Sequence, residues 1–291
     1  MKFYPHGIFP SFFCISLSMM ALDNTELNLD YHFLGDEGVA ELASAMKSNT
    51  SIKNLNLGHG VIGDQGARAI GAMLKANSGL TALRLYNNNI GDAGIAAIAD
   101  AVQQNTTLEI LDLFNNNTGV QGAIDLASAL KRNSTLTELD LGFNRCETTG
   151  ARAFAESLYE NCALNVLNLS NNQIHGDGAC SLQDALKVNS SLTSINLYFN
   201  PIPVSLDEEI SRAAKFNQIH LALNPGEKEL WLCLMGVTSA DLPEPLIKIC
   251  SAVSPKAKEI WLCLLESKIV RLPDELVCLL FKRYLKEAAP H

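Results

Sequence analysis

Basic residues are scarce in this chain of 291 residues, which has 22 lysines and arginines against 31 aspartates and glutamates and a formal net charge of −9. A protein that binds the phosphate backbone of a nucleic acid needs a concentrated basic face. The charge balance therefore argues against a nucleic-acid partner and favours a basic or otherwise polar protein. Hydrophobic residues make up 47% of the chain, so a large core can be buried and wholesale disorder is not expected.

Cysteine pairs with the spacing of a metal site are also missing. None of the eight cysteines belongs to a CxxC pair, and no zinc-type CxxC…HxxxH spacing occurs. Cys233, Cys263 and Cys278 stand in apolar runs, where a free cysteine behaves as a small buried hydrophobe. These features predict a reducing, cytoplasmic setting and no bound metal.

Motifs that carry catalysis are absent from the sequence as well. No phosphate loop, nucleophile elbow or HExxH motif is present, and the six histidines are scattered. We therefore expect no enzyme activity, no catalytic residue and no cofactor.

The strongest positive signal is a period of 28 residues. Two leucine columns, a glycine column and an asparagine column share one register. The leucine columns are Leu27, Leu55, Leu83, Leu111, Leu139, Leu167 and Ile195, and Leu29, Leu57, Leu85, Leu113, Leu141, Leu169 and Leu197. The others are Gly38, Gly66, Gly94, Gly122, Gly150 and Gly178, and Asn49, Asn77, Asn105, Asn133, Asn161, Asn189 and Asn217. A shared register of this length indicates a stacked array, because one unit cannot bury its own apolar edge.

Each unit reads as a strand, a turn, a helix and a return loop. The Leu-x-Leu alternation has period 2 and predicts a short strand with one buried face. In the third unit, Asp92 is placed to cap the helix that follows it. Ile95, Ile98, Ala99 and Val102 have helical spacing, and Asn105 is expected to end the helix in the left-handed conformation.

The segment Leu80-x-x-Leu83-x-Leu85-x-x-Asn88-x-Ile90 resembles the LxxLxLxxNxL signature, and its unit is similar to the ribonuclease-inhibitor type of leucine-rich repeat. The resemblance implies an α/β fold, a leucine-rich-repeat solenoid (horseshoe) of about seven 28-residue strand–helix repeats with a helical C-terminal cap. Its ladder asparagine stands at Asn88, Asn116, Asn144, Asn172 and Asn200. His32 and Gly60 replace it in the first two repeats, so a different turn geometry is expected there.

Three segments follow from this pattern. Residues 1–21 form an N-terminal segment or cap, since Pro5 and Pro10 interrupt an apolar run too short to span a bilayer. A cleaved signal peptide remains open, although only Lys2 supplies the expected charge. Residues 22–218 form the repeat array, and we expect no membrane partner.

Residues 219–291 are predicted to form a helical C-terminal domain of two related halves, after one last strand at 219–223. The halves are marked by KELWLCL at 228–234 and KEIWLCL at 258–264. Their simplest role is to cap the array. The segment LPDEL at 272–276 faintly resembles an F-box core, so recruitment of a second protein by these helices is an alternative.

Strand residues that point away from the core line the concave face of such an array, and an aromatic row among polar residues is typical of a protein-binding surface. The fold does not require aromatic or acidic residues there, which makes them candidates for partner contact. Carboxylates outnumber the lone Arg84 on this face. The candidate protein-binding residues are Tyr31, His59, Arg84, Tyr86, Asp112, Phe114, Glu138, Asp140, Phe143, Tyr198 and Phe199.

The function expected from these features is a non-catalytic scaffold that holds a partner protein on its concave face. The resemblance implies that the partner could be an enzyme that the scaffold inhibits or regulates. Stand-alone arrays of this type also resemble effectors that intracellular bacteria deliver into the host cytoplasm. Two alternatives stay open. One is an adaptor with an F-box-like C-terminal region. The other is a GTPase activator, which is raised only because the repeats resemble those of the activator of the nuclear GTPase Ran; Arg145 is the arginine in the most loop-like position. The oligomeric state does not follow from the sequence.

Overall fold

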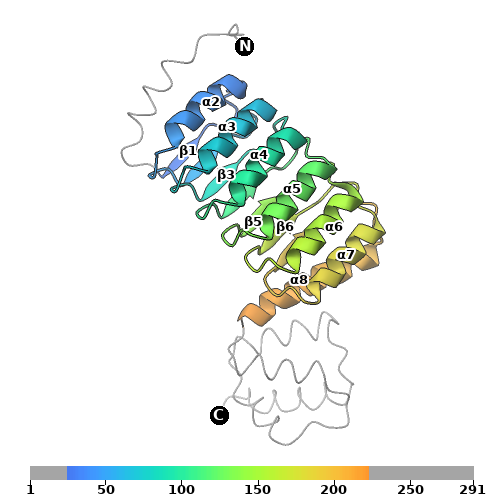
Figure 1. Cartoon of the computed structure of the whole chain (residues 1–291). Coiled ribbons are helices and arrows are strands. Elements are labelled where there is room, and N and C mark those ends of the chain that lie inside the picture. Colours follow the sequence, from blue (N-terminus) through green and yellow to red (C-terminus); the bar gives the residue numbers. More distant parts are fainter. Residues whose placement is uncertain (1–24, 223–291) are drawn as a thin grey trace, which may run out of the picture. The chain divides into compact units, whose positions relative to one another are not determined.

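The computed structural model describes residues 25–222 of the chain, where seven strands alternate with seven helices (Figure 1). The strands are β1 Glu26–Asn28, β2 Asn54–Asn56, β3 Ala82–Arg84, β4 Ile110–Asp112, β5 Glu138–Asp140, β6 Val166–Asn168 and β7 Ser194–Asn196. The helices are α2 Gly35–Met46, α3 Asp64–Leu74, α4 Asp92–Val102, α5 Val120–Leu130, α6 Glu147–Leu158, α7 Gly176–Leu186 and α8 Val204–Ala222. The segment predicted at 1–21 and nearly all of the domain predicted at 219–291 lie outside the described residues.

All seven strands form one parallel sheet in the order of the sequence, β1 to β7. Residues 28 apart are direct partners, for example Leu27 with Leu55 and Leu55 with Leu83. The helices α2 to α7 lie side by side along one side of this sheet (Figure 1). The predicted solenoid of strand–helix repeats is therefore confirmed. The side of the sheet that faces away from these helices is called the open sheet face below.

The core runs through the array between the sheet and the helices. Both leucine columns contribute to it, with Leu83, Leu85, Leu111 and Leu113 fully buried. From the helices, Ile95 and Ile98 are also fully buried, as their spacing predicts. Each unit closes its core only against its neighbours, which explains why the columns keep one register.

The helix-end asparagines act differently from the prediction. None of them has a positive φ, so the left-handed helix end expected at Asn105 is wrong. Instead, the Asn105 side-chain nitrogen donates to the carbonyl oxygens of Leu74 and Asn77 in the preceding repeat, at 2.8 and 3.2 Å. Its side-chain oxygen accepts from the backbone N–H groups of Thr107 and Leu108. The same bonds recur down the column and join each return loop to the one before it.

The capping aspartates also act between repeats. Asp92 was predicted to cap its own helix, but its carboxylate accepts from Gly119 and Gly122 at the start of the next helix, at 2.7 and 3.0 Å. Asp36 and Asp64 serve α3 and α4 in the same way. A carboxylate suits this place because the first N–H groups of a helix lack intrahelical partners. The equivalent position in the fourth repeat is Val120, which interrupts these contacts; in the fifth repeat the Thr148 hydroxyl accepts from the His175 N–H at 3.0 Å.

The seventh unit ends the regular pattern. Helix α8 is 19 residues long and begins after Pro201 and Pro203. It extends to Ala222, so the last strand predicted at 219–223 is wrong: residues 219–222 are helical. Within residues 25–222, no helix combines the length and the apolar character needed to cross a membrane.

Candidate functional site

The open sheet face consists of the two outward strand positions of each repeat and the turn that follows. The predicted residues Arg84, Asp112, Glu138 and Asp140 occupy outward strand positions, in register across β3, β4 and β5. The other seven lie in the turns after the strands. Four are exposed, Tyr31, Phe143, Tyr198 and Phe199, and the rest are partly buried.

The acidic strand positions have a structural role that the sequence interpretation overlooked. In six of the seven repeats, an Asn or Asp at the last strand position accepts a hydrogen bond from the backbone N–H two residues later. These residues are Asn28, Asn56, Asp112, Asp140, Asn168 and Asn196. Such Asx turns fix the exit of the chain from the strand. The expectation that the fold does not need these side chains is therefore wrong for Asp112 and Asp140.

Arg84 is the exception in this row. An arginine side chain has no acceptor, so it cannot form the Asx turn that its six equivalents form. It has no ion-pair partner within 4 Å among residues 25–222. Its neighbours across the sheet are Asn56 and Asp112. The local fold does not account for an arginine here, and it remains a candidate for partner contact.

One turn position adopts the left-handed conformation in every repeat. Its seven residues have φ between 49° and 62°: Tyr31, His59, Asn87, Asn115, Phe143, Asn171 and Phe199. Asparagine tolerates this conformation well, whereas a bulky aromatic residue is strained by about 1 kcal/mol or more. Tyr31, Phe143 and Phe199 are therefore aromatic residues at a turn position where the fold favours asparagine.

Two of the candidate aromatic rings pack on glycines of neighbouring repeats. A Cβ added at Gly58 would come within 2.4 Å of the Tyr86 ring, and one added at Gly142 within 2.9 Å of the Phe114 ring. The Tyr86 hydroxyl also accepts from the Asn56 side chain at 3.3 Å, and burial raises the pKa of Tyr86. Tyr86 and Phe114 therefore contribute to the fold itself as well as to the surface.

The rings of the open sheet face, with Tyr86 and Phe114 among them, form two clusters and one isolated pair. Tyr31 stacks on His59 with centroids 3.9 Å apart, and His59 meets Tyr86 edge-on at 5.6 Å. Phe114 and Phe143 form a second contact at 5.0 Å. Tyr198 and Phe199, 66% and 80% exposed, follow the last strand and make no ring contact within the described residues.

Two exposed apolar residues near the first cluster were missed. Phe33 and Val61 also have positive φ and lie in the turns of the first two repeats, where His32 and Gly60 replace the ladder asparagine. In the third repeat, Asn88 donates to the carbonyl oxygens of Leu57 and Leu85 and shapes the turn. His32 and Gly60 cannot supply these amide bonds, but the positive φ alone does not set the first two repeats apart, since Gln173 beside Asn172 has it too. In the sequence, the bulky residues Phe33 and Val61 directly follow His32 and Gly60, and this could have marked them as exposed apolar candidates.

Asp112 carries the largest electrostatic effect on this face. Burial raises the pKa of its carboxyl to about 6, and the negative charge of Asp140 adds to the shift. The bond from the Phe114 N–H and the charge of Arg84 act in the opposite direction. Because this pKa lies above its ordinary value of 3.8, the folded chain binds more protons than the unfolded chain between these values. Stability should therefore fall as pH rises from 4 to 6.

We expect Asp112→Asn to raise the free energy of unfolding at pH 7 by about 1 kcal/mol, after allowance for solvent screening. Asparagine keeps the Asx turn, as Asn56 and Asn168 do, and removes the poorly solvated charge. The loss of stability between pH 4 and 6 should become shallower. Urea denaturation at pH 4.5 and pH 7 would measure both effects, with Asp125→Asn on α5 as control. A less stable variant at pH 7 would contradict this account of the charge.

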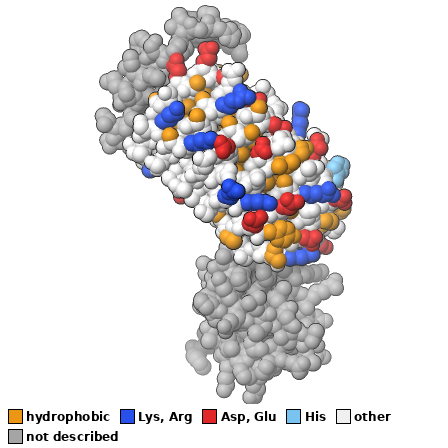
Figure 2. Space-filling model, viewed as in Figure 1, with side chains coloured by type: hydrophobic (Ala, Val, Ile, Leu, Met, Phe, Trp, Pro, Cys, Tyr) orange, Lys and Arg blue, Asp and Glu red, His pale blue; other side chains and the backbone are white. Residues whose placement is uncertain are grey.

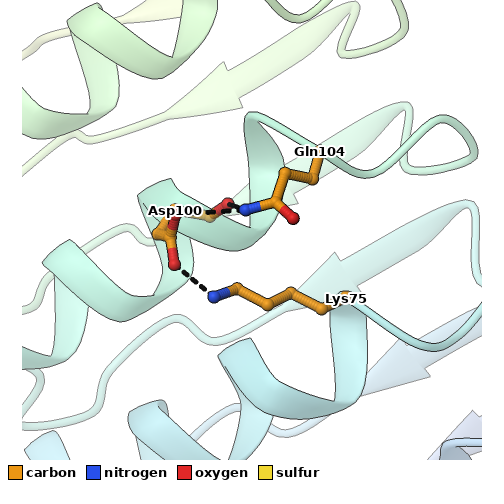
Figure 3. A network of polar contacts seen from close by, with 3 residues as sticks. All are labelled: Lys75, Asp100 and Gln104. Atoms are coloured by element: carbon orange, nitrogen blue, oxygen red, sulfur yellow. Dashed lines mark hydrogen bonds and ion pairs between the residues drawn. The ribbon is translucent and has the colours of Figure 1, made fainter.

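The helix side of the array has a different character. In Figure 2, acidic and basic side chains are interspersed over this side, with no large area of one sign. Neighbouring helices share ion pairs, such as Arg152 with Asp177 at 3.2 Å. In Figure 3, Asp100 accepts from Lys75 of the preceding helix and from Gln104 at 3.2 Å. The bond from Lys75 lowers the pKa of Asp100.

Within residues 25–222, no group of three or more histidine, cysteine or acidic residues has the arrangement of a metal site.

A model of the leucine-rich repeat matches residues 48–71, 76–99, 104–127, 132–155 and 160–182, in step with the strands and helices described above. The chain contains leucine-rich repeats. Its further assignment to the ribonuclease-inhibitor type and its likeness to bacterial effectors remain predictions.

Two solved structures similar to this chain are those of "Leiomodin-1 Actin-Binding Site 2 (ABS2)" and of the tropomodulin C-terminal domain of Caenorhabditis elegans. The first is 35% identical, with 40% of this chain and 68% of that chain covered and a TM-score of 0.37. The second is 11% identical, with 64% and 95% covered and a TM-score of 0.43. A search of curated proteins found no significant match to the sequence.

Proposed function

We propose that this chain is a non-catalytic scaffold that binds a partner protein on its open sheet face. The observation that carries the proposal is the placement of aromatic residues at the left-handed turn position, where Asn87, Asn115 and Asn171 show what the fold prefers. Exposed Tyr31, Phe143 and Phe199 lower stability at this place, and exposed aromatic side chains are frequent anchors of protein interfaces.

The scaffold would regulate its partner by covering part of its surface, an enzyme active site being one example. We also propose that it works in a reducing, cytoplasmic compartment, or in a host cytoplasm if it is a secreted effector. In support, Cys146, Cys162 and Cys180 are unpaired. The adaptor alternative depends on residues beyond 222, and no feature of the described array favours it over simple binding.

The repeats themselves supply a substitution that tests the proposal. Tyr31→Asn, Phe143→Asn and Phe199→Asn together should leave the free energy of unfolding unchanged or slightly higher, because asparagine is the residue of three equivalent turns. The same triple variant should bind the partner at least about tenfold more weakly. The measurement is capture of proteins from a cell extract by the full chain, followed by the Kd of the main captured protein.

Tyr159→Asn with Val188→Asn is the matched control, since both residues are exposed apolar side chains at the ends of α6 and α7. This double variant should retain the partner. Equal capture by the triple variant and the wild type would place the interface elsewhere and overturn the proposal.

A further inference from the structure

We propose that the β4–β5 section of the open sheet face binds a basic segment of the partner protein, with an arginine or lysine side chain held beside Asp112 and Asp140. The inference rests on the proposed function and names the chemistry of the partner. Its evidence is the charge, the packing and the ring contacts of five residues, Asp112, Phe114, Glu138, Asp140 and Phe143.

The negative charge at this section is not needed by the fold. Asp112 and Asp140 form Asx turns, but Asn28, Asn56, Asn168 and Asn196 form the same turn without a charge. A carboxylate at the partly buried position 112 also carries a desolvation cost that an amide avoids. The two adjacent carboxylates therefore require an explanation outside the fold.

The carboxylates of this section outnumber the one cation beside them, Arg84, which is the neighbour of Asp112 across the sheet and lowers its pKa without forming an ion pair. Asp112 and Asp140 are direct partners across β4 and β5, and Glu138 lies on the same face two residues before Asp140. None of the three forms an ion pair with any of the described residues. The Asn168 side chain donates to both oxygens of Asp140, at 2.9 and 3.0 Å, but contributes no charge. A positively charged partner group would complement this section.

An aromatic surface lies next to these carboxylates. The Phe114 ring rests over Gly142, where any larger residue would collide with it, and is 5.0 Å from the Phe143 ring. Phe143 is 41% exposed in its left-handed turn. A guanidinium or ammonium group is attracted both by a ring face and by a carboxylate, so this combination suits a basic side chain better than a neutral one.

A protein segment fits this section better than a free metal ion. The described residues offer no group of three ligands that could enclose a metal. The section also continues on both sides into further outward side chains, Arg84 and Asn56 toward β2 and Asn168 and Asn196 toward β7. An extended or protruding segment can contact several of these residues at once.

Selection of a phage-displayed library of random 12-residue peptides on the full-length chain tests the inference. We expect the selected peptides to share an arginine or lysine. A synthetic peptide of the consensus should bind Asp112→Asn/Asp140→Asn at least about tenfold more weakly than wild type. Glu41→Gln/Glu156→Gln, which changes the net charge equally on exposed positions of α2 and α6, should bind within about twofold. Binding to wild type should weaken below pH 6, as Asp112 becomes protonated.

The outcomes separate this inference from the proposed function. A library that yields no peptide, or peptides without a shared basic residue, overturns the inference. Peptides that bind Asp112→Asn/Asp140→Asn as well as wild type but fail to bind Tyr31→Asn/Phe143→Asn/Phe199→Asn also overturn it, while the proposed function stands. Peptides whose binding survives both sets of changes overturn the two together.

Discussion

Replacing Asn133 by leucine is expected to lower the free energy of unfolding by about 4 kcal/mol, since several buried backbone groups lose their partners. Asn133 lies in the loop between α5 and β5 and is buried. Its side-chain nitrogen donates to the carbonyl oxygens of Val102 and Asn105, at 2.7 and 3.1 Å. Its side-chain oxygen accepts from the N–H groups of Thr135 and Leu136, at 3.0 and 2.7 Å.

Leucine has a similar volume but can form none of these four bonds. Each buried donor or acceptor left without a partner costs about 1–3 kcal/mol, and rearrangement of the loop recovers part of the sum. Asn117→Leu is the matched control, because Asn117 is exposed and its side chain forms a hydrogen bond with Asn89 alone among residues 25–222. Urea denaturation followed by circular dichroism would compare both variants with wild type. Equal stability of the two variants would mean that the helix-end asparagines do not join the repeats.

A single methyl group added at Gly71 is expected to cost about 2 kcal/mol, although alanine is the better helix former by nearly 1 kcal/mol. Gly71 is buried in α3 where that helix passes α4. A Cβ at this position would lie 2.5 Å from the carbonyl oxygen of Ala97. Because the obstacle is backbone rather than a movable side chain, Gly71→Ala should force the two helices apart.

The control for this change is Gly176→Ala at the start of α7. No atom lies within 4 Å of a Cβ added at Gly176. Alanine there should therefore be neutral or stabilise the chain by up to about 1 kcal/mol. Thermal and urea unfolding of the two variants would settle the comparison. If Gly71→Ala proved as stable as Gly176→Ala, the close approach of α3 and α4 would not limit stability.

The array was predictable from sequence because each column reflects a local requirement that recurs in six or seven repeats. Leu83 and Leu85 indicate a strand by their spacing, and Ile95 and Ile98 a helix by theirs. Contacts between repeats were not predictable in this way. Asp92 and Asn105 have types that suit capping and turns, but their partners lie 27 to 31 residues away. Only the stacking of the repeats places those groups side by side.

The candidate surface was predictable in outline for the same reason, since strand alternation indicates which residues point outward. The role of each residue was not. Asp112 forms an Asx turn as well as contributing a negative charge to the surface, and the ring of Tyr86 packs on Gly58. The strain at Phe143 depends on φ, which a single sequence does not reveal. Comparison among the seven repeats of the structure separates what the fold needs from what it tolerates.

The carboxylate contacts that run from one helix to the next have a mechanical consequence. They join α2 to α3, α3 to α4 and α4 to α5. Val120 interrupts them, so α6 begins without such a bond, and the Thr148 hydroxyl supplies an equivalent one between α6 and α7. The boundary between the fourth and fifth repeats is therefore the place where we expect the solenoid to bend first under load. Asp112 and Asp140 stand on opposite sides of that boundary. A basic side chain bound by both carboxylates would therefore stiffen this boundary. Its release would let the first four repeats move relative to the repeats that follow.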